Sequence, residues 1–479
     1  MQYTLFDLDS PIFPKLYLFK NSTKLGSIYQ TINWSSLVEL LPEKKTMAGA
    51  PAWLPPQGYF GLMFLKHYTK LSDEKLLERF NTDWAMQLFC GILLPDNEII
   101  RDNSFVSSVR SYLGQHIDLE NFQSKMVENW KEELPEKHVV LADATCYEVY
   151  IRFPTDAKIL WECCEWLWDK QIPQFCKANK LKEPRSKFKE QKKKHLIYSK
   201  LRKKAHRKTQ ARKRVSLQLL SKGINEFQAI LNQTKAVGLS SKDASVFKTI
   251  KQVYQQQNHY FNHPKSKIKH RIVSLHKPYI RPIVRGKENK PVEFGIKVHK
   301  VQVGGINLIE HRSYEAFNEC KRLKISVLKH KNKFKECTHL SADRIYATNE
   351  NRRFCTQNDI QTNFVRKGAG KDDKPTKKIK ELLNKQRSTS LEGSFGTEKE
   401  HYLLHKIKAQ NPVTEQVWAV RRCDVLWHTY SQRRQDCIKA RKSQERTSAS
   451  SLKRSILSLK NNLRQVRWNN YVSKLSSWG

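Results

Sequence analysis

The sequence predicts an α/β protein: a mixed sheet flanked by helices, with a helical N-terminal domain before it and a basic helical insertion within it. Three observations lead to this prediction. Residues 55–133 carry a series of helical patterns, an apolar run at 139–142 and a short segment at 339–342 have the character of strands, and residues 182–214 form a dense block of cations. The predicted boundaries are residues 1–134 for the helical domain, 135–410 for the mixed-sheet domain, about 155–268 for the insertion and 411–479 for a basic C-terminal tail.

The charge balance indicates a polyanionic partner. The 479 residues include 88 Lys and Arg but 46 Asp and Glu, which gives a formal net charge of +42. Nucleic acid is the commonest partner of so basic a protein, and an anionic membrane surface is the alternative. Because a membrane surface usually requires a clear amphipathic anchor, which we do not find, nucleic acid is the better prediction.

No segment has the pattern of a membrane span or a secretory signal. The longest apolar run, residues 58–65, is far shorter than the roughly 20 residues that a span needs. The N-terminal stretch MQYTLFDLDS has no basic start and no long apolar core. The ten cysteines form no CxxC pair, which argues against zinc and disulfide frameworks. These features predict a cytoplasmic protein with reduced cysteines.

The N-terminal domain is expected to contain short helices joined by tight turns. One covers residues 58–68, a second is capped by Ser72 and a third by Thr82. Further helices are expected at residues 104–113 and from about 119 to 133. This layout resembles a helix-turn-helix that reads DNA, and it fits a small helical core equally well.

The first strand is expected at residues 138–142 and is followed directly by Asp143. The continuous apolar run before this aspartate is typical of a strand that is buried on both faces. A carboxylate at the end of a central strand is costly to bury without a cation, which makes Asp143 a candidate site residue. The alternative is an aspartate that only caps the turn after the strand.

The insertion carries a dense block of positive charge. Residues 182–214 include 16 Lys or Arg against two Glu. A solvated helix is the alternative, but like charges at this density repel one another unless they are neutralised. We therefore predict contact with the phosphates of DNA. The candidate DNA-binding residues are Lys192, Lys193, Lys194, Arg202, Lys203, Lys204, Arg207, Lys208, Arg212, Lys213 and Arg214.

Strand patterns return after Arg271. Residues 292–298 and 301–309 have strand character, with a turn at the glycine pair 304–305, and a helix is expected from about 314 to 328. Residues 339–342 then form a short strand that ends in a second aspartate, Asp343.

A third carboxylate, Glu392, lies in the stretch RSTSLEGSFGTEKEHY. At helical spacing Glu392, Phe395 and Lys399 share one face. Gly393 and Gly396 interrupt this helix at a cost of roughly 1 kcal/mol each, which points to a close backbone approach. A surface helix with an exposed Glu and Lys is the alternative.

Two strand-end aspartates and a helical glutamate form the set of ligands that two-metal phosphoryl transfer requires. Carboxylates packed together repel one another by about 4 kcal/mol per contact at 4 Å. Two Mg²⁺ ions, which prefer oxygen ligands, convert that repulsion into binding, and Mn²⁺ can substitute for them.

Three segments resemble the catalytic blocks of the DDE transposases of bacterial insertion sequences. They are LADAT around Asp143, SADRIYATNENRRF around Asp343 and R…LEGSFGTEKEHY around Glu392. EFGIKVH and the helical residues 55–113 are also similar to that family. The resemblance covers roughly residues 1–410, and its strength lies in the order and spacing of three blocks.

The resemblance implies a ribonuclease H-like catalytic domain. It implies that the catalytic and metal-binding residues are Asp143, Asp343 and Glu392. It also implies that the residues contacting transposon-end DNA include Lys399, Arg387 and Tyr346. The chain departs from the family pattern in two respects: Arg387 lies five residues before Glu392 rather than about four, and the long insertion follows Asp143 rather than Asp343.

The predicted function is therefore metal-dependent cleavage of DNA at transposon ends, followed by strand transfer to target DNA. The partners expected are the terminal inverted repeats and target DNA, bound by a homodimer at the bacterial nucleoid. The alternatives are a catalytically decayed DNA-binding protein and a metal-dependent nuclease without joining activity.

Overall fold

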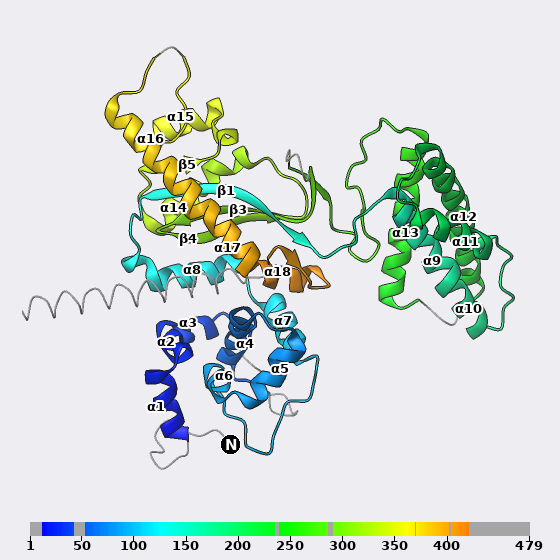
Figure 1. The fold of residues 1–479 in the computed structure, drawn as a ribbon, viewed down its shortest axis with the longest axis horizontal. Helices are drawn as coiled ribbons and strands as arrows, with labels where there is room; N and C mark the ends of the chain where they lie inside the picture. The colour runs from blue at the N-terminus through cyan, green and yellow to red at the C-terminus, as the bar shows by residue number, and fades with distance from the viewer. Residues whose placement is uncertain are drawn as a thin grey trace, which may run out of the picture.

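The computed structural model describes residues 12–42, 53–234, 239–285, 291–368, 370–401 and 404–420. Most of the predicted C-terminal tail, from residue 421 onward, lies outside these residues. Figure 1 shows the N-terminal helices below a mixed sheet, with the helices of the insertion set apart from that sheet on extended connections. In the described part of the chain, every helix is too short or too polar to cross a lipid bilayer.

The N-terminal region is helical, as its sequence patterns predict. Its helices are α1 (Ile12–Ser22), α2 (Lys24–Thr31), α3 (Trp34–Val38), α4 (Pro56–Thr69), α5 (Asp73–Thr82), α6 (Trp84–Phe89), α7 (Phe105–His116) and α8 (Leu119–Trp130). Ser72 caps α5 as expected, because its side chain accepts a hydrogen bond from the Lys75 amide. The cap of α6 is Asp83 rather than the predicted Thr82, since the Asp83 carboxylate accepts from the Ala85 and Met86 amides.

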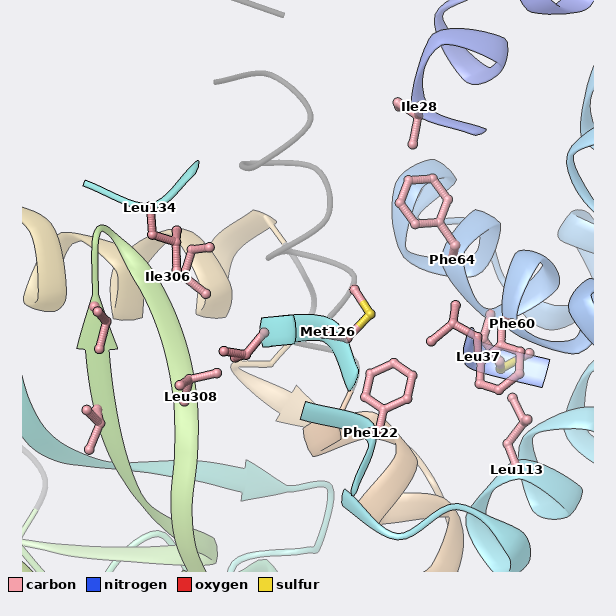
Figure 2. Packing of buried hydrophobic residues seen from close by; sticks show 14 of the residues in the cluster. Ile28, Leu37, Phe60, Phe64, Leu113, Phe122, Met126, Leu134, Ile306 and Leu308 are labelled. Atoms are coloured by element: carbon pink, nitrogen blue, oxygen red, sulfur yellow. The ribbon is translucent and has the colours of Figure 1, made fainter. Parts of the chain in front are cut away.

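Helix α8 joins the N-terminal helices to the sheet. Its side chains Phe122 and Met126 lie between Leu308 of the sheet and Phe60 of α4 (Figure 2). All four side chains are buried and belong to one continuous apolar cluster. The N-terminal helices and the sheet therefore share a core, which fixes one against the other.

The sheet is mixed, with a long antiparallel part and a short parallel part. Its strands are β1 (Val139–Val149), β2 (Pro282–Val284), β3 (Val292–Val303), β4 (Ile306–Ser313), β5 (His339–Ala342), β6 (Gln361–Thr362) and β7 (Lys406–Ile407). The strand order is β2-β3-β1-β5-β6, with β4 also paired to β3 and β7 to β1. Strand β3 runs antiparallel to β1 and β4, whereas β5 and β6 extend the sheet parallel to β1.

The first strand is longer than its sequence pattern predicts. We expected β1 to end before Asp143, but it continues to Val149. Residues 141–148 pair with β3 along this length, so cross-strand hydrogen bonds extend the strand past the aspartate. The turn between β3 and β4 matches the prediction: Gly304 and Gly305 both have positive φ, at 55° and 81°, as a tight hairpin requires.

The insertion has an apolar core of its own. It comprises α9 (Asp156–Glu165), a π-helical turn (Trp166–Gln171), α10 (Ile172–Ala178), α11 (Phe188–Lys200), α12 (His206–Gln233) and α13 (Ser241–Asn262). Its buried cluster includes Trp161, Trp166 and Phe227 and is separate from the cluster shared by the sheet and N-terminal helices. The aromatic residues of this segment therefore hold the basic helices together.

The remaining helices complete the sheet domain. They are α14 (Leu323–Phe334), α15 (Asn349–Gln357), α16 (Lys374–Gln386), α17 (Gly393–His401) and α18 (Pro412–Val420), with short 3₁₀ turns at Glu319–Arg322 and Arg344–Tyr346. Helix α14 begins nine residues later than the predicted start at Tyr314, because residues 314–318 are irregular and Asn318 caps the 3₁₀ turn that precedes the helix. Helix α18 lies against α7 and so places the start of the predicted tail within the fold.

Candidate active site

Asp143 and Asp343 lie at the same level of two adjacent strands. Residues 139–142 of β1 pair in parallel register with residues 339–342 of β5, so the next residue on each side is an aspartate. Side chains at the same level of neighbouring strands point to the same face of a sheet. The two aspartates are therefore neighbours, as their two strand-like contexts predict.

The end of β5 is set by side-chain hydrogen bonds. Asn363 takes the place of a strand neighbour at Ala342: its Oδ1 accepts from the Ala342 amide at 3.1 Å and its Nδ2 donates to the Ala342 carbonyl at 2.9 Å. Asp343 then caps the following 3₁₀ turn, since its Oδ1 accepts from the Arg344 amide at 2.7 Å. Its side chain is exposed at the edge of the site.

Asp143 lies in a more buried position than Asp343. Burial raises the pKa of Asp143 to about 6, while the hydrogen bond from the Ala144 amide and the charge of Arg387 act in the opposite direction. The neighbouring carboxylates of Glu319 and Asp343 act on the pKa in the same direction as burial. A cation at this position would therefore favour the charged form of Asp143.

Glu392 reaches the same place from the helix that crosses the sheet. It ends a π-helical turn, Arg387–Glu392, between α16 and α17. Arg387 Nη1 lies 2.7 Å from Glu392 Oε1 and 3.6 Å from Asp143 Oδ2. The Arg387 guanidinium thus bridges two of the three predicted ligands, and its buried Nε has no hydrogen-bond partner among the described residues.

The three carboxylates do not form a closed metal site in this arrangement. Among the residues that the structure describes, no group of three or more His, Cys, Asp or Glu is arranged to hold a metal ion. The donor set itself fits Mg²⁺, because it consists of carboxylate oxygens. A cationic group, Arg387, already lies between Asp143 and Glu392, at the place where a metal ion would neutralise them.

Comparison with known protein families gives a match for the N-terminal helices. Residues 16–112 match the family model described as Transposase domain (DUF772). The N-terminal helices are thus similar to a transposase domain, which indicates a role in DNA transposition. The match runs from within α1 to within α7 and supports the resemblance to insertion-sequence transposases. No curated protein and no solved structure matches the chain.

The three predicted DNA-binding residues near the carboxylates lie in different surroundings. Tyr346 is fully buried and its hydroxyl has no hydrogen-bond partner among the described residues, so it does not face DNA in this arrangement. Lys399 is half-buried on α17, seven residues after Glu392. Arg387 is engaged with the carboxylates themselves.

The two glycines beside Glu392 are not explained by a contact within the protein. A Cβ added at Gly393 or Gly396 would meet nothing within 4 Å. The sequence-based interpretation of a close backbone approach is therefore wrong for the described residues of this chain.

Most of the predicted cations of the insertion are exposed on α11, α12 and the loop between them. The exposed members are Lys192, Lys193, Lys194, Arg202, Lys203, Lys204, Arg207, Lys208 and Arg214. Among these, Lys192 and Lys194 also pair with Asp169 and Glu190 of the insertion. The other two predicted cations are less exposed and contact side chains of the insertion. Lys213 Nζ lies 2.6 Å from Asp156 Oδ2, and Arg212 donates to Gln191 Oε1 at 2.7 Å. We therefore assign Lys213 and Arg212 to the packing of the insertion.

One group of buried polar residues was missed by the sequence analysis. Lys300 of β3 and Glu398 of α17 form an ion pair in which the side chains are 0% and 1% exposed. Tyr147 of β1 and Asn307 of β4 also donate to Glu398. The available signal was a lysine inside the apolar strand pattern of residues 292–303. Its partner was not recognisable, because it lies 98 residues away in the chain.

Proposed function

We propose that the protein is a DDE-type transposase that cleaves DNA at the ends of its element and joins those ends to target DNA. One observation carries the proposal: Asp143 and Asp343 occupy the same level of adjacent strands, and Arg387 links Glu392 to Asp143. The transposase domain at residues 16–112 supplies the context of DNA transposition.

The sheet supports the ribonuclease H-like part of the proposal. Its antiparallel strands β4, β3 and β1 carry the first aspartate, and the parallel strand β5 carries the second. The helix with Glu392 lies against the same sheet through contacts with β1. A central strand flanked by a parallel neighbour thus brings residues far apart in the chain to one edge, as a shared catalytic site requires.

Asp143, Asp343 and Glu392 would hold two Mg²⁺ ions, with Mn²⁺ as a substitute. When bound, the ions activate water and neutralise charge on the attacked phosphate. The protein's own contribution is to hold the three carboxylates and the DNA in a fixed geometry. In this proposal, Arg387 keeps Asp143 and Glu392 together until DNA and metal arrive, and then turns to the DNA phosphate.

The proposed reaction has two exchanges at phosphorus. In the first, a water oxygen bonds to the phosphorus at the transposon end, the bond to the 3′-oxygen breaks, and that oxygen takes up a proton to become a 3′-OH. In the second, this 3′-OH bonds to a phosphorus of target DNA, and the displaced target oxygen leaves with a proton as a new 3′-OH. Neither exchange requires a nucleophile from the protein.

The proposed partner is double-stranded DNA, contacted at two places. Lys399 lies on the helix of Glu392, where it can contact the DNA next to the cleaved bond. The exposed cations of α11 and α12 lie away from the carboxylates on the insertion, where they can hold more distant phosphates (Figure 1). We propose a homodimer on DNA, because two transposon ends must be joined in one event.

A strand-transfer assay tests the proposal. The protein is incubated with Mg²⁺, a target plasmid and DNA carrying the inverted repeats that flank the gene, supplied either uncut or with pre-cut 3′ ends. We expect cleavage of the uncut ends and joining of the pre-cut ends to the plasmid. Cleavage without joining would instead identify a nuclease, and end binding without either reaction would identify a decayed transposase.

A further inference from the structure

The helix that carries Glu392 is attached to the sheet by a buried polar network. Lys300 donates to Glu398 Oε2 and to the Tyr147 hydroxyl. Tyr147 donates to the same carboxylate oxygen at 2.5 Å, and Asn307 donates to Glu398 Oε1 at 3.0 Å. Three adjacent strands, β1, β3 and β4, therefore converge on one carboxylate of α17.

The network continues along the helix toward Glu392. Asn307 also donates to Ser394 Oγ at 2.8 Å, and Gln302 donates to the Ser390 carbonyl at 3.3 Å. Lys300 Nζ lies 4.3 Å from the centre of the Phe395 ring. Each turn from residue 390 to residue 398 is thus held to the sheet, and Glu392 lies within this held segment.

Lys300 is directly opposite Asp143 in the sheet. The two residues are partners in the antiparallel register of β1 and β3, so their side chains point to the same face. Tyr147 lies four residues after Asp143 on β1 and therefore shares that face. The residues that hold α17 and the first aspartate thus project from one surface of the sheet.

The energetics argue that this ion pair does more than stabilise the fold. A buried ion pair loses solvation for both charges, and well-packed apolar residues of similar volume would stabilise a core as well or better. A directional pair can instead select one orientation of a helix, which apolar contacts do less strictly. Lys300 and Glu398 have the directional contacts that such a role requires.

We propose that Lys300 and Glu398 are positioning residues that set the rotation and depth of α17, so that Glu392 faces Asp143. The proposal rests on the transposase function proposed above. Neither residue contacts the reacting atoms; each acts through the orientation of the helix. Loss of the pair should let α17 shift on the sheet while the sheet and the basic surface of the insertion stay intact.

The test removes both charges together, in the variant Lys300→Met/Glu398→Gln. The double change leaves no unpaired charge in the core, so folding should be preserved. The two single variants should differ in stability for the same reason. Glu398→Gln leaves Lys300 buried without its counter-charge, whereas Lys300→Met leaves a carboxyl group that can become neutral, since burial raises the pKa of Glu398 and favours its protonation once the lysine is gone. Glu398→Gln should therefore unfold at a lower temperature than the double variant.

A second buried pair provides a matched control. Lys277 Nζ lies 2.7 Å from Glu415 Oε1, with side chains that are 10% and 0% exposed. Tyr279 and Tyr314 also donate to Glu415, so this pair has a similar set of partners. It ties α18, rather than α17, to the sheet domain. The control variant is Lys277→Met/Glu415→Gln.

Two measurements decide the proposal. In metal-free protein without DNA, amide hydrogen exchange of residues 393–401 should be faster in Lys300→Met/Glu398→Gln than in the wild type and the control. In single-turnover cleavage at saturating end DNA, the rate should fall about 10- to 100-fold. The affinity for end DNA should change far less than the cleavage rate, because most of the proposed phosphate contacts lie on the insertion.

Unchanged exchange in residues 393–401 would overturn the proposed attachment of α17. Faster exchange with a wild-type cleavage rate would overturn the positioning role. A fall in cleavage that the control variant shows equally would also overturn it, because the effect would then be general. If the wild-type protein itself does not cleave, the proposed function fails, and the exchange measurement still decides whether the pair holds the helix.

Discussion

Arg387 and Glu392 form an ion pair of 2.7 Å across a single π-helical turn. The two residues are five positions apart, whereas an α-helix aligns residues three or four apart. A π-helical turn bonds residue i to residue i+5 and therefore aligns a spacing of five. The π-helical turn thus accommodates the five-residue spacing between Arg387 and Glu392. In this geometry Arg387 contacts both Glu392 and Asp143.

Replacing Arg387 should make the site more dependent on metal. In Arg387→Gln, the partly buried Asp143 carboxylate loses a neighbouring cation, and we expect a loss of about 1–3 kcal/mol in the free energy of unfolding without metal. Mg²⁺ should then raise the melting temperature more in the variant than in the wild type. Thermal unfolding with and without Mg²⁺ measures both effects.

A matched control is Arg110→Gln. Arg110 Nη2 lies 2.7 Å from Asp73 Oδ1 in the N-terminal helices, and the Arg110 side chain is 7% exposed. It should lose stability without any change in the effect of Mg²⁺. An identical Mg²⁺ shift in wild type and Arg387→Gln would show that Arg387 does not stand in for the metal.

Removing a candidate ligand should abolish cleavage but not DNA binding. The variants Asp143→Asn, Asp343→Asn and Glu392→Gln each lose one negative charge, and metal-ion catalysis contributes several kcal/mol to such reactions. We expect the cleavage rate to fall by about 10³-fold or more, with end binding retained in a gel-shift assay. Joining of pre-cut ends by Asp343→Asn at the wild-type rate would refute the assignment of Asp343.

The exposed cations of the insertion should determine the salt dependence of DNA binding. Replacing Lys193, Arg202, Lys203 and Lys208 by Gln should lower the slope of log affinity against log salt by about 0.9 for each DNA phosphate that the variant no longer neutralises. Lys213→Gln is the control, since Lys213 pairs with Asp156. It should reduce stability by about 1–2 kcal/mol and leave the slope unchanged. An unaltered slope in the fourfold variant would exclude phosphate binding by these four residues.

The glycine at position 396 should be replaceable with a gain in stability. Its backbone is helical and an added Cβ would meet nothing within 4 Å, so Gly396→Ala should add about 1 kcal/mol to the free energy of unfolding. Gly114→Ala is the opposite case, because its Cβ would lie 2.8 Å from the Val413 carbonyl oxygen. Chemical denaturation should therefore shift in opposite directions for the two variants, and a loss of stability in Gly396→Ala would contradict this expectation.

Stability should fall in acid as Glu310 is protonated. Burial opposes ionisation of Glu310, but hydrogen bonds from His299 and Arg322 outweigh it and lower its pKa to about 2. Because the folded pKa lies below the ordinary value of 4.5, the stabilisation is present above about pH 5 and is lost as the pH falls toward 2. It amounts to about 3 kcal/mol. Burial also lowers the pKa of His311, so protonation of this residue adds to the loss of stability in acid.

The comparison of wild type with Glu310→Gln measures this contribution. The difference between their free energies of unfolding should be largest at neutral pH and should shrink between pH 5 and the acid limit of the folded state. A difference that is independent of pH would show that packing, rather than the charge of Glu310, is responsible.

Local patterns predicted the elements well where neighbours in the chain decide the structure. The Ser72 cap, the strand at residues 339–342 and the Gly304–Gly305 turn all depend on a few adjacent residues. Patterns failed where distant residues decide. Strand β1 extends beyond Asp143 because β3 pairs with it along residues 141–148.

In the candidate site too, short segments indicated some residues, and tertiary packing decided the rest. Asp143, Asp343 and Glu392 were recognisable from short segments, and parallel pairing of β1 with β5 then brought the two aspartates together. The burial of Tyr346 and the pairing of Lys213 with Asp156 were not recognisable. Both depend on which side chains pack around them, and residue type alone does not determine that.

By itself, the sequence determined the alternation of helices and strands and the positive charge of the insertion, and it named three carboxylates as candidate metal ligands. Only the tertiary structure decided that Arg387 bridges Asp143 and Glu392, and that Lys300 and Glu398 hold α17 to the sheet. The physical reason is that periodicity and capping act over a few residues. Register, burial and ion pairing join residues such as Tyr147 and Glu398, which are 251 positions apart.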